Sequence, residues 1–259
     1  MYFHGGGFVL GGHESCEAVC RVIARRTGLA VVSIDYRLAP EHPFPAAVED
    51  GVAAFRWLRD HLSELDVPAG RIAVAGESAG GNLTAVVANA TARDEAGGPV
   101  FQCPIFPVAD WAEKSRSYEL FPSGWFLTEA QMDWYGERYL PGLDRRNPLA
   151  SPIYAPLDEL ADVAPACVVT AGFDPLRDEG RAYAQRLADA GVEVRHLEFR
   201  GFIHGFINAT GLGRSVVARV ERIADVIAEG MGLWAARQSP PRCFETAASR
   251  PPQPPEPTR

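Results

Sequence analysis

The sequence has no long apolar run and no excess of positive charge. No stretch reaches the roughly 18 apolar residues that a membrane-spanning helix needs, so we expect no membrane span. Its 25 Lys and Arg stand against 33 Asp and Glu, which gives a net charge of −8 over 259 residues. That balance argues against nucleic acid or an anionic membrane surface as the main partner.

Cysteine is also scarce. Five cysteines, an odd number with wide spacing, predict reduced thiols in a cytoplasmic protein. Cys16 and Cys20 would share one face of a helix and could form half of a metal site. No second pair of Cys or His at ligand spacing accompanies them, so we predict that both residues serve only in packing.

What the sequence does have is an alternation of strand-like and helix-like segments. Helical patterns of apolar residues lie between short runs that are rich in Val and Ile. This alternation predicts an α/β fold, with a mostly parallel central sheet and helices on both faces. The predicted strands are residues 29–37, 71–77, 100–106, 166–172 and 192–199.

Two regions depart from this alternation. Residues 110–150 are rich in Trp, Tyr and loop residues and contain at most one good helix, which suggests an excursion beside the sheet. Residues 238–259 hold seven of the 21 prolines and are predicted to form a disordered tail. We therefore predict one α/β domain over residues 1–237, with 110–150 as a lid or excursion segment, followed by the tail.

A G-x-S-x-G motif follows the predicted strand 71–77 and opens a helix. In Gly76-Glu77-Ser78-Ala79-Gly80, the sharp turn would expose the hydroxyl of Ser78, and the helix N-terminus would favour negative charge beside it. The alternative is a Gly-rich turn in which Ser78 only caps the helix. The features that follow favour a nucleophilic serine.

An activated serine needs a base, and the base needs an orienting acid, in the chain order Ser, Asp, His for this kind of turn. Asp174 follows the predicted strand 166–172, and His204 follows the predicted strand 192–199 between two glycines. We predict Asp174 as the acid and His204 as the base. Asp174 is also suited to helix capping, and Asp110 and Asp178 are its competitors for the acid.

The stretch His4-Gly5-Gly6-Gly7 near the start of the chain is suited to binding an oxyanion. Consecutive glycines let backbone N–H groups approach a substrate closely, and acyl transfer needs such donors. We predict that Gly6 and Gly7, with the N–H of Ala79, form an oxyanion hole. A phosphate-binding loop is disfavoured, because no Gly-Lys-Ser/Thr follows.

Taken together, the stretches "YFHGGGFVLG", "DYRLAPEHPFPAA", "GESAGGNL", "AGFDPLRDEG" and "GFIHGF" resemble the bacterial hormone-sensitive-lipase family (family IV) of α/β-hydrolases over residues 2–230. The resemblance implies the same roles for Ser78, Asp174, His204, Gly6, Gly7 and Ala79. It also implies a carboxylesterase that prefers short acyl chains of a small-molecule ester, with no metal or cofactor. The prediction allows a homodimer, and Glu77, where many members have Asp, is expected to leave the mechanism unchanged.

The resemblance also raises questions of length, specificity and function. Family members carry two strands and part of a lid before the His-Gly loop, so we expect these to be missing here. Phe121, Trp125 and Phe126 are expected to contribute to a lid or acyl wall, with plain core packing as the alternative. The alternative functions are an amidase or formamidase, an inactive fragment, or a small-molecule receptor like those for plant gibberellins, which lack the histidine.

Overall fold

A parallel sheet forms the centre of the computed structural model, which describes residues 1–65, 71–233 and 244–246. Within these residues seven strands pair in the order β2-β1-β3-β4-β5-β6-β7, and every neighbouring pair is parallel. The strands are β1 (Tyr2–Phe3), β2 (Ser33–Ile34), β3 (Ala73–Glu77), β4 (Phe101–Ile105), β5 (Ala166–Phe173), β6 (Val194–Ile203) and β7 (Phe244–Thr246).

Four of the five predicted runs form strands close to their expected bounds, whereas 29–37 contributes only the two residues of β2. The reason is that β2 lies at the edge of the described sheet and pairs only with β1, which is itself two residues long. Of the tail 238–259, only β7 is described, paired with β6, and the rest lies outside the described residues.

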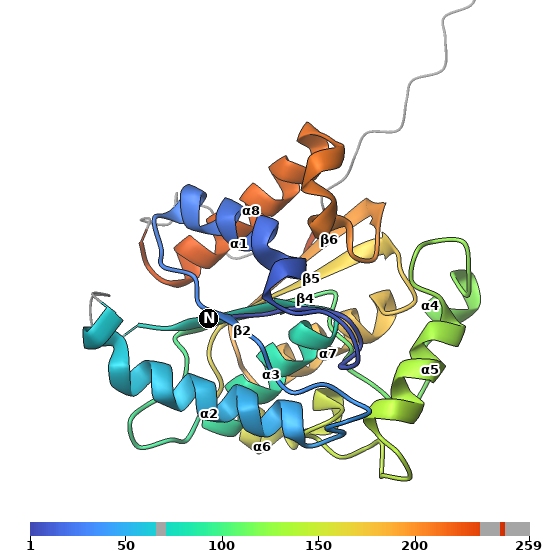
Figure 1. Ribbon diagram of the computed structural model, residues 1–259, viewed down its shortest axis with the longest axis horizontal. Coiled ribbons are helices and arrows are strands. Elements are labelled where there is room, and N and C mark those ends of the chain that lie inside the picture. Colours follow the sequence, from blue (N-terminus) through green and yellow to red (C-terminus); the bar gives the residue numbers. More distant parts are fainter. Residues whose placement is uncertain (66–70, 234–243, 247–259) are drawn as a thin grey trace, which may run out of the picture.

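Helices cover both faces of the sheet, as the alternation predicted (Figure 1). Helices α1 (His13–Thr27) and α8 (Arg214–Gly230) lie together on one face, and their apolar sides form one core with β4, β5 and β6. Helices α2 (Ala46–His61), α3 (Ala79–Thr91) and α7 (Arg177–Asp189) lie on the other face. Shorter helical segments are η1 (Leu62–Leu65), η2 (Pro152–Tyr154), α6 (Leu157–Leu160) and η3 (Phe206–Leu212).

The excursion over residues 110–150, between β4 and β5, contains two helices, whereas the sequence predicted at most one good helix. These are α4 (Arg116–Leu120) and α5 (Glu129–Tyr139), which stand beside the sheet in Figure 1. Helix α4 has only five residues, little more than one turn, so it is too short to show a helical period in the sequence. Helix α5 begins with a capping box, in which the Thr128 side chain accepts from the N–H of Gln131.

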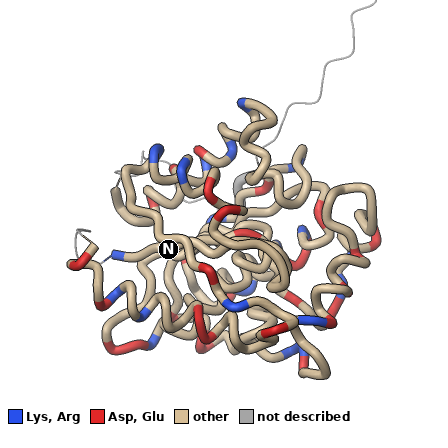
Figure 2. The backbone as a smooth tube through the Cα atoms, viewed as in Figure 1, with Lys and Arg blue, Asp and Glu red and all other residues tan. Residues whose placement is uncertain are grey.

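Charged residues lie mainly on the outer helices and loops, with acidic and basic side chains interspersed in the view of Figure 2. The sheet and the helix faces that pack against it are predominantly apolar. None of the helices in the described part of the chain is long and apolar enough to span a membrane.

Candidate active site at the carboxyl ends of the strands

The predicted site residues come together at one edge of the sheet. Ser78 follows β3, Asp174 follows β5 and His204 follows β6, while the His-Gly loop follows β1. All four strands are parallel, so their carboxyl ends lie at the same edge. Residues far apart in the sequence therefore meet where open α/β sheets place their binding sites.

Ser78 occupies a strained turn between β3 and α3. Its φ of 58° and ψ of −116° are unusual for a residue with a side chain. The surrounding backbone holds this conformation, because the Ser78 N–H donates to the carbonyl of Ile105 at 2.9 Å and its carbonyl accepts from the N–H of Asn82 at 3.0 Å. The hydroxyl of Ser78 makes no bond that caps the helix.

The glycines on either side of Ser78 are required by close packing. A Cβ atom on Gly76 would lie 2.5 Å from the carbonyl oxygen of Gly80, and one on Gly80 would lie 2.1 Å from that of Phe3. Neither position has room for a side chain. The motif therefore combines a strained serine with a tight contact between strand, helix and the start of the His-Gly loop.

A chain of two hydrogen bonds connects Ser78, His204 and Asp174. The Ser78 Oγ lies 2.9 Å from His204 Nε2, and His204 Nδ1 lies 2.8 Å from Asp174 Oδ2. The Asp174 side chain is fully buried, and its other oxygen accepts the N–H of Leu176 at 2.8 Å. Asp174 thus both orients His204 and fixes the turn before α7.

The buried carboxylate determines how the His204 ring is protonated. An ionised Asp174 can only accept hydrogen bonds, so the facing Nδ1 of His204 carries the proton in the neutral ring. Nε2 is then an acceptor, and the Ser78 hydroxyl donates to it. The ring of Phe106, 4.7 Å away between centroids, packs against the His204 ring.

The His-Gly loop lies against Ser78, and contacts between His4 and Tyr36 hold it in place. The His4 ring stacks on Tyr36 at 4.2 Å, and the Tyr36 hydroxyl donates to the His4 carbonyl at 2.8 Å. Gly6 and Gly7 have φ values of 116° and 63°, which glycine adopts without strain. Their N–H groups donate to no residue in the described part of the chain. Ala79 is the first, buried residue of α3.

A cavity of about 290 Å³ opens above these groups. Its polar floor includes Ser78, His204 and the glycines of the His-Gly loop. Its wall includes Phe126 and Tyr135 from the excursion between β4 and β5, and Tyr135 packs so closely on Gly7 that a Cβ atom there would lie 2.3 Å from its ring. The cavity therefore has a polar base and a largely apolar wall.

The structure separates the three aromatic residues that were expected to form the acyl wall. Phe126 lines the cavity and is 71% exposed. Trp125 instead stacks on Phe173 at 4.5 Å, and Phe121 contacts the edge of the same ring at 5.7 Å. The turn with positive φ at Phe126 directs its side chain away from this aromatic cluster.

Sequence reasoning did not place Glu77, Tyr135 or Asn208 in the site, although all three line the cavity. Glu77 directly precedes Ser78, and Asn208 lies four residues beyond His204, about one helical turn away. These spacings could have indicated both. Tyr135 has no such local signal, because only the tertiary fold brings α5 to the His-Gly loop.

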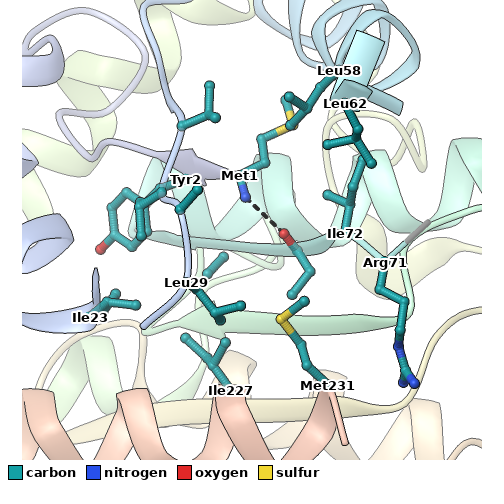
Figure 3. Close-up of a pocket in the computed structure, with 15 residues that line it drawn as sticks. Met1, Tyr2, Ile23, Leu29, Leu58, Leu62, Arg71, Ile72, Ile227 and Met231 are labelled. Atoms are coloured by element: carbon teal, nitrogen blue, oxygen red, sulfur yellow. Dashed lines mark hydrogen bonds between the residues drawn. The ribbon is translucent and has the colours of Figure 1, made fainter. Parts of the chain in front are cut away.

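A second cavity, of about 90 Å³, lies at the amino ends of the strands (Figure 3). It is lined by aliphatic and sulfur-containing side chains, including Met1, Leu58, Leu62, Ile227 and Met231. The amino group of Met1 donates to the carbonyl of Ala73 at 2.9 Å, and burial lowers the pKa of this amino group to about 6. This cavity has the character of an incompletely filled core.

Cys16 and Cys20 lie on one face of α1 with their sulfurs 3.9 Å apart. Cys16 is buried and contacts the Ser33 hydroxyl at 3.3 Å. Among the described residues, no group of three or more His, Cys, Asp or Glu side chains is placed to hold a metal ion.

The parallel sheet and the serine turn at its carboxyl edge define an α/β-hydrolase. A family model described by the alpha/beta hydrolase fold matches residues 1–208. The chain belongs to this family, in the branch that resembles hormone-sensitive lipase.

Curated relatives and solved structures agree with this assignment. The chain is 44% identical to carboxylic ester hydrolase LipN of Mycobacterium tuberculosis, over 88% of this chain and 62% of the relative. It is 38% identical to an arylesterase of Saccharolobus solfataricus, over 85% and 72%. An esterase structure from Pyrobaculum calidifontis superposes with a TM-score of 0.82 at 42% identity, covering 88% of this chain and 75% of that one. The chain thus spans less than two thirds of the length of LipN.

Proposed function

We propose that this chain is a serine carboxylesterase that hydrolyses short-chain acyl esters. The observation that carries the proposal is the hydrogen-bonded series Ser78–His204–Asp174 at the base of a cavity, beside the N–H groups of Gly6 and Gly7. Relatives that are named carboxylic ester hydrolase and ethyl acetate hydrolase support it. A homodimer and a cytoplasmic location stay predictions.

The proposed reaction begins when Ser78 attacks the ester carbonyl. His204 Nε2 takes the hydroxyl proton, and Asp174 stabilises the resulting imidazolium without itself being protonated. The carbonyl oxygen becomes an oxyanion, for which Gly6, Gly7 and Ala79 are the proposed donors. His204 then protonates the leaving alcohol as the carbon–oxygen bond breaks, which yields an acyl-enzyme at Ser78.

The second half of the reaction repeats these roles with water as the nucleophile. His204 removes a proton from water, the resulting hydroxide attacks the acyl carbonyl, and the Ser78 oxygen leaves with the proton returned by His204. The products are a carboxylic acid and an alcohol, and free Ser78 is regenerated. Every proton moves between groups that this chain supplies, the substrate and water.

A panel of nitrophenyl esters from acetate to palmitate, with a matched nitroanilide, tests the proposal. We expect turnover of the short esters, much slower turnover of palmitate, and little hydrolysis of the anilide. Preferential cleavage of the anilide would indicate an amidase instead. Absence of hydrolysis of any member by the folded chain would contradict the proposed function.

A further inference from the structure

A buried carboxyl group lies directly beside the proposed nucleophile and has no role in the mechanism above. Glu77 is the last residue of β3 and is only 1% exposed. Burial raises the pKa of its side chain to about 7. Placing a group that ionises near neutral pH in the interior is costly, and such groups concentrate at functional sites.

One oxygen of Glu77 reaches the segment that follows His204. The Asn208 Nδ2 donates to Glu77 Oε1 at 3.4 Å, across 131 positions of sequence. Asn208 belongs to η3, which begins two residues after His204. The Glu77 side chain therefore contacts the same short segment that positions the proposed base.

Glu77 also packs against the opposite side of the site. A Cβ atom on Gly5 would lie 3.3 Å from Glu77 Cγ and 3.4 Å from the Cβ of Ser78, so the His-Gly loop rests directly on both residues. The Tyr2 hydroxyl, the Gly5 N–H and the Asn208 amide each favour the charged carboxylate, which partly offsets the effect of burial on its pKa. Glu77 thus contacts both segments that flank Ser78, namely the His-Gly loop and the segment that follows His204.

The ionisable groups that interact with the charge of Glu77 are phenols and thiols. They are Tyr2 on β1, Tyr36 after β2, and Cys16 and Cys20 on α1. None of these is a basic group that would neutralise a carboxylate. Glu77 Oε2 has no hydrogen-bond partner among the described residues. The Glu77 carboxyl group therefore has no basic partner among these groups with which to form a stabilising ion pair.

We propose that Glu77 is a positioning residue, which holds the His-Gly loop and the segment from His204 to Asn208 in register around Ser78. This inference rests on the proposed function. Removing the side chain would free both loops to shift relative to Ser78, and small displacements of aligned reacting groups cost much of their rate advantage. The loss should fall on kcat rather than KM, because alignment matters most in the transition state.

Glu77→Ala and Glu77→Gln separate the parts of this role. Glu77→Ala should lower kcat by about 10- to 100-fold with little change in KM. Glu77→Gln keeps a similar shape and an oxygen that can accept from Asn208, so its kcat at pH 8 should stay within about threefold of the unaltered chain. It also removes the one group here whose pKa lies at about 7. Any inflection that ionisation of Glu77 gives to the pH profile of kcat near pH 7 should therefore be absent from Glu77→Gln.

A double-mutant cycle tests the link to Asn208. Asn208→Ala should lower kcat by a smaller factor, about 3- to 10-fold, and adding it to Glu77→Ala should cause little further loss. Glu198→Ala is the matched control, since Glu198 on β6 is also a buried carboxylate but pairs with Arg181 on α7. It should lower stability while leaving kcat per folded molecule unchanged.

Ser78→Ala, measured in parallel, distinguishes failure of the proposed function from failure of the inference about Glu77. If it leaves hydrolysis intact, the proposed function itself is wrong. If it abolishes hydrolysis, the inference is overturned by Glu77→Ala with at least half the original kcat, or by a Glu77→Gln pH profile that superimposes on the original. Should Glu77→Ala not fold, the Glu77→Gln profile and the Asn208→Ala loss decide, and absence of either effect overturns the inference.

Discussion

The cavities at the two ends of the sheet are lined by different kinds of side chain. At the amino ends, the smaller cavity is lined mainly by flexible aliphatic and sulfur-containing side chains such as Leu58 and Met231. At the carboxyl ends, the larger cavity contains Ser78 and His204 and lies beside the buried carboxyl of Glu77. One end completes the core, whereas the other keeps polar groups in costly positions.

Backbone strain follows the same division. The described chain contains four non-glycine residues with clearly positive φ, namely Phe8, Ser78, Phe106 and Phe126. Phe8 belongs to the segment after β1, and the other three line the larger cavity. Strained residues persist only where the surrounding structure holds them and are concentrated at functional sites. Three of the four positive-φ residues therefore lie at the end of the sheet that holds the proposed active site.

The largest expected effect is loss of the nucleophile or the base. Ser78→Ala and His204→Ala should each lower kcat for butyrate ester by about 10⁴-fold or more with folding intact, because the two groups act as a unit. Ser15→Ala is the control, since Ser15 lines the same cavity but its hydroxyl donates to the carbonyl of Gly12. Its kcat should stay nearly unchanged. If folded Ser78→Ala keeps a tenth of the original activity, Ser78 is not the nucleophile.

Loss of the orienting acid should have the next largest effect. Asp174→Asn should lower kcat by about 10³- to 10⁴-fold, because an amide in this place favours the wrong tautomer of His204. Asp178→Asn is the comparison, since Asp178 is nearby but pairs with Arg177 and Arg181. Equal activities for the two variants would argue against Asp174 as the acid.

The sequence was sufficient for the parts of this site that depend on local backbone chemistry. Ser78 needs a strand, a tight turn with small neighbours and a helix, and these requirements are visible in adjacent letters. Asp174 and His204 each follow an apolar strand, so a parallel sheet brings them to one edge. The fold was predicted for the same reason, since alternation along the chain specifies the layers.

The parts that were not predicted depend on contacts between distant segments. Tyr135 reaches Gly7 only because α5 packs beside the sheet, and nothing near Tyr135 in the sequence indicates this. Trp125 and Phe126 are neighbours with different surroundings, because a positive φ at Phe126 turns the two side chains apart. The shortness of β2 follows from its equally short neighbour β1 rather than from its own apolar residues.

The proposed oxyanion loop can be tested with a pair of glycines. A Cβ atom on Gly6 would lie 2.1 Å from the carbonyl oxygen of Leu10, so Gly6→Ala must displace the loop. We expect kcat to fall by about 10²- to 10³-fold, as for loss of one oxyanion donor. Gly28 also has positive φ, 74°, but a Cβ atom there would meet no other part of the described chain within 4 Å. Gly28→Ala should cost about 1 kcal/mol of stability and leave kcat unchanged, and equal kcat for both variants would contradict the proposal.

A substitution at the amino ends of the strands should lower the stability of the protein rather than its catalytic rate. Leu58 is 3% exposed and lines the smaller cavity, so Leu58→Ala should lower the free energy of unfolding by about 2–5 kcal/mol, as measured by urea denaturation. At a temperature where the variant is folded, its kcat/KM should match that of the unaltered chain. A tenfold loss of kcat in the folded variant would show that the two ends of the sheet are not independent.

The smallest expected effect concerns the wall of the larger cavity. Phe126 lines this cavity, whereas its neighbour Trp125 stacks on Phe173. Phe126→Ala should make room for longer acyl chains, each additional buried methylene contributing about 0.8 kcal/mol until the next wall is met. The ratio of kcat/KM for octanoate to that for butyrate ester should therefore rise by about 3- to 10-fold in Phe126→Ala. In Trp125→Ala the ratio should stay constant, because that ring faces the aromatic cluster and not the substrate. If both variants shift the ratio equally, the wall extends to Trp125 and its contact with Phe173 supports the acyl site as well.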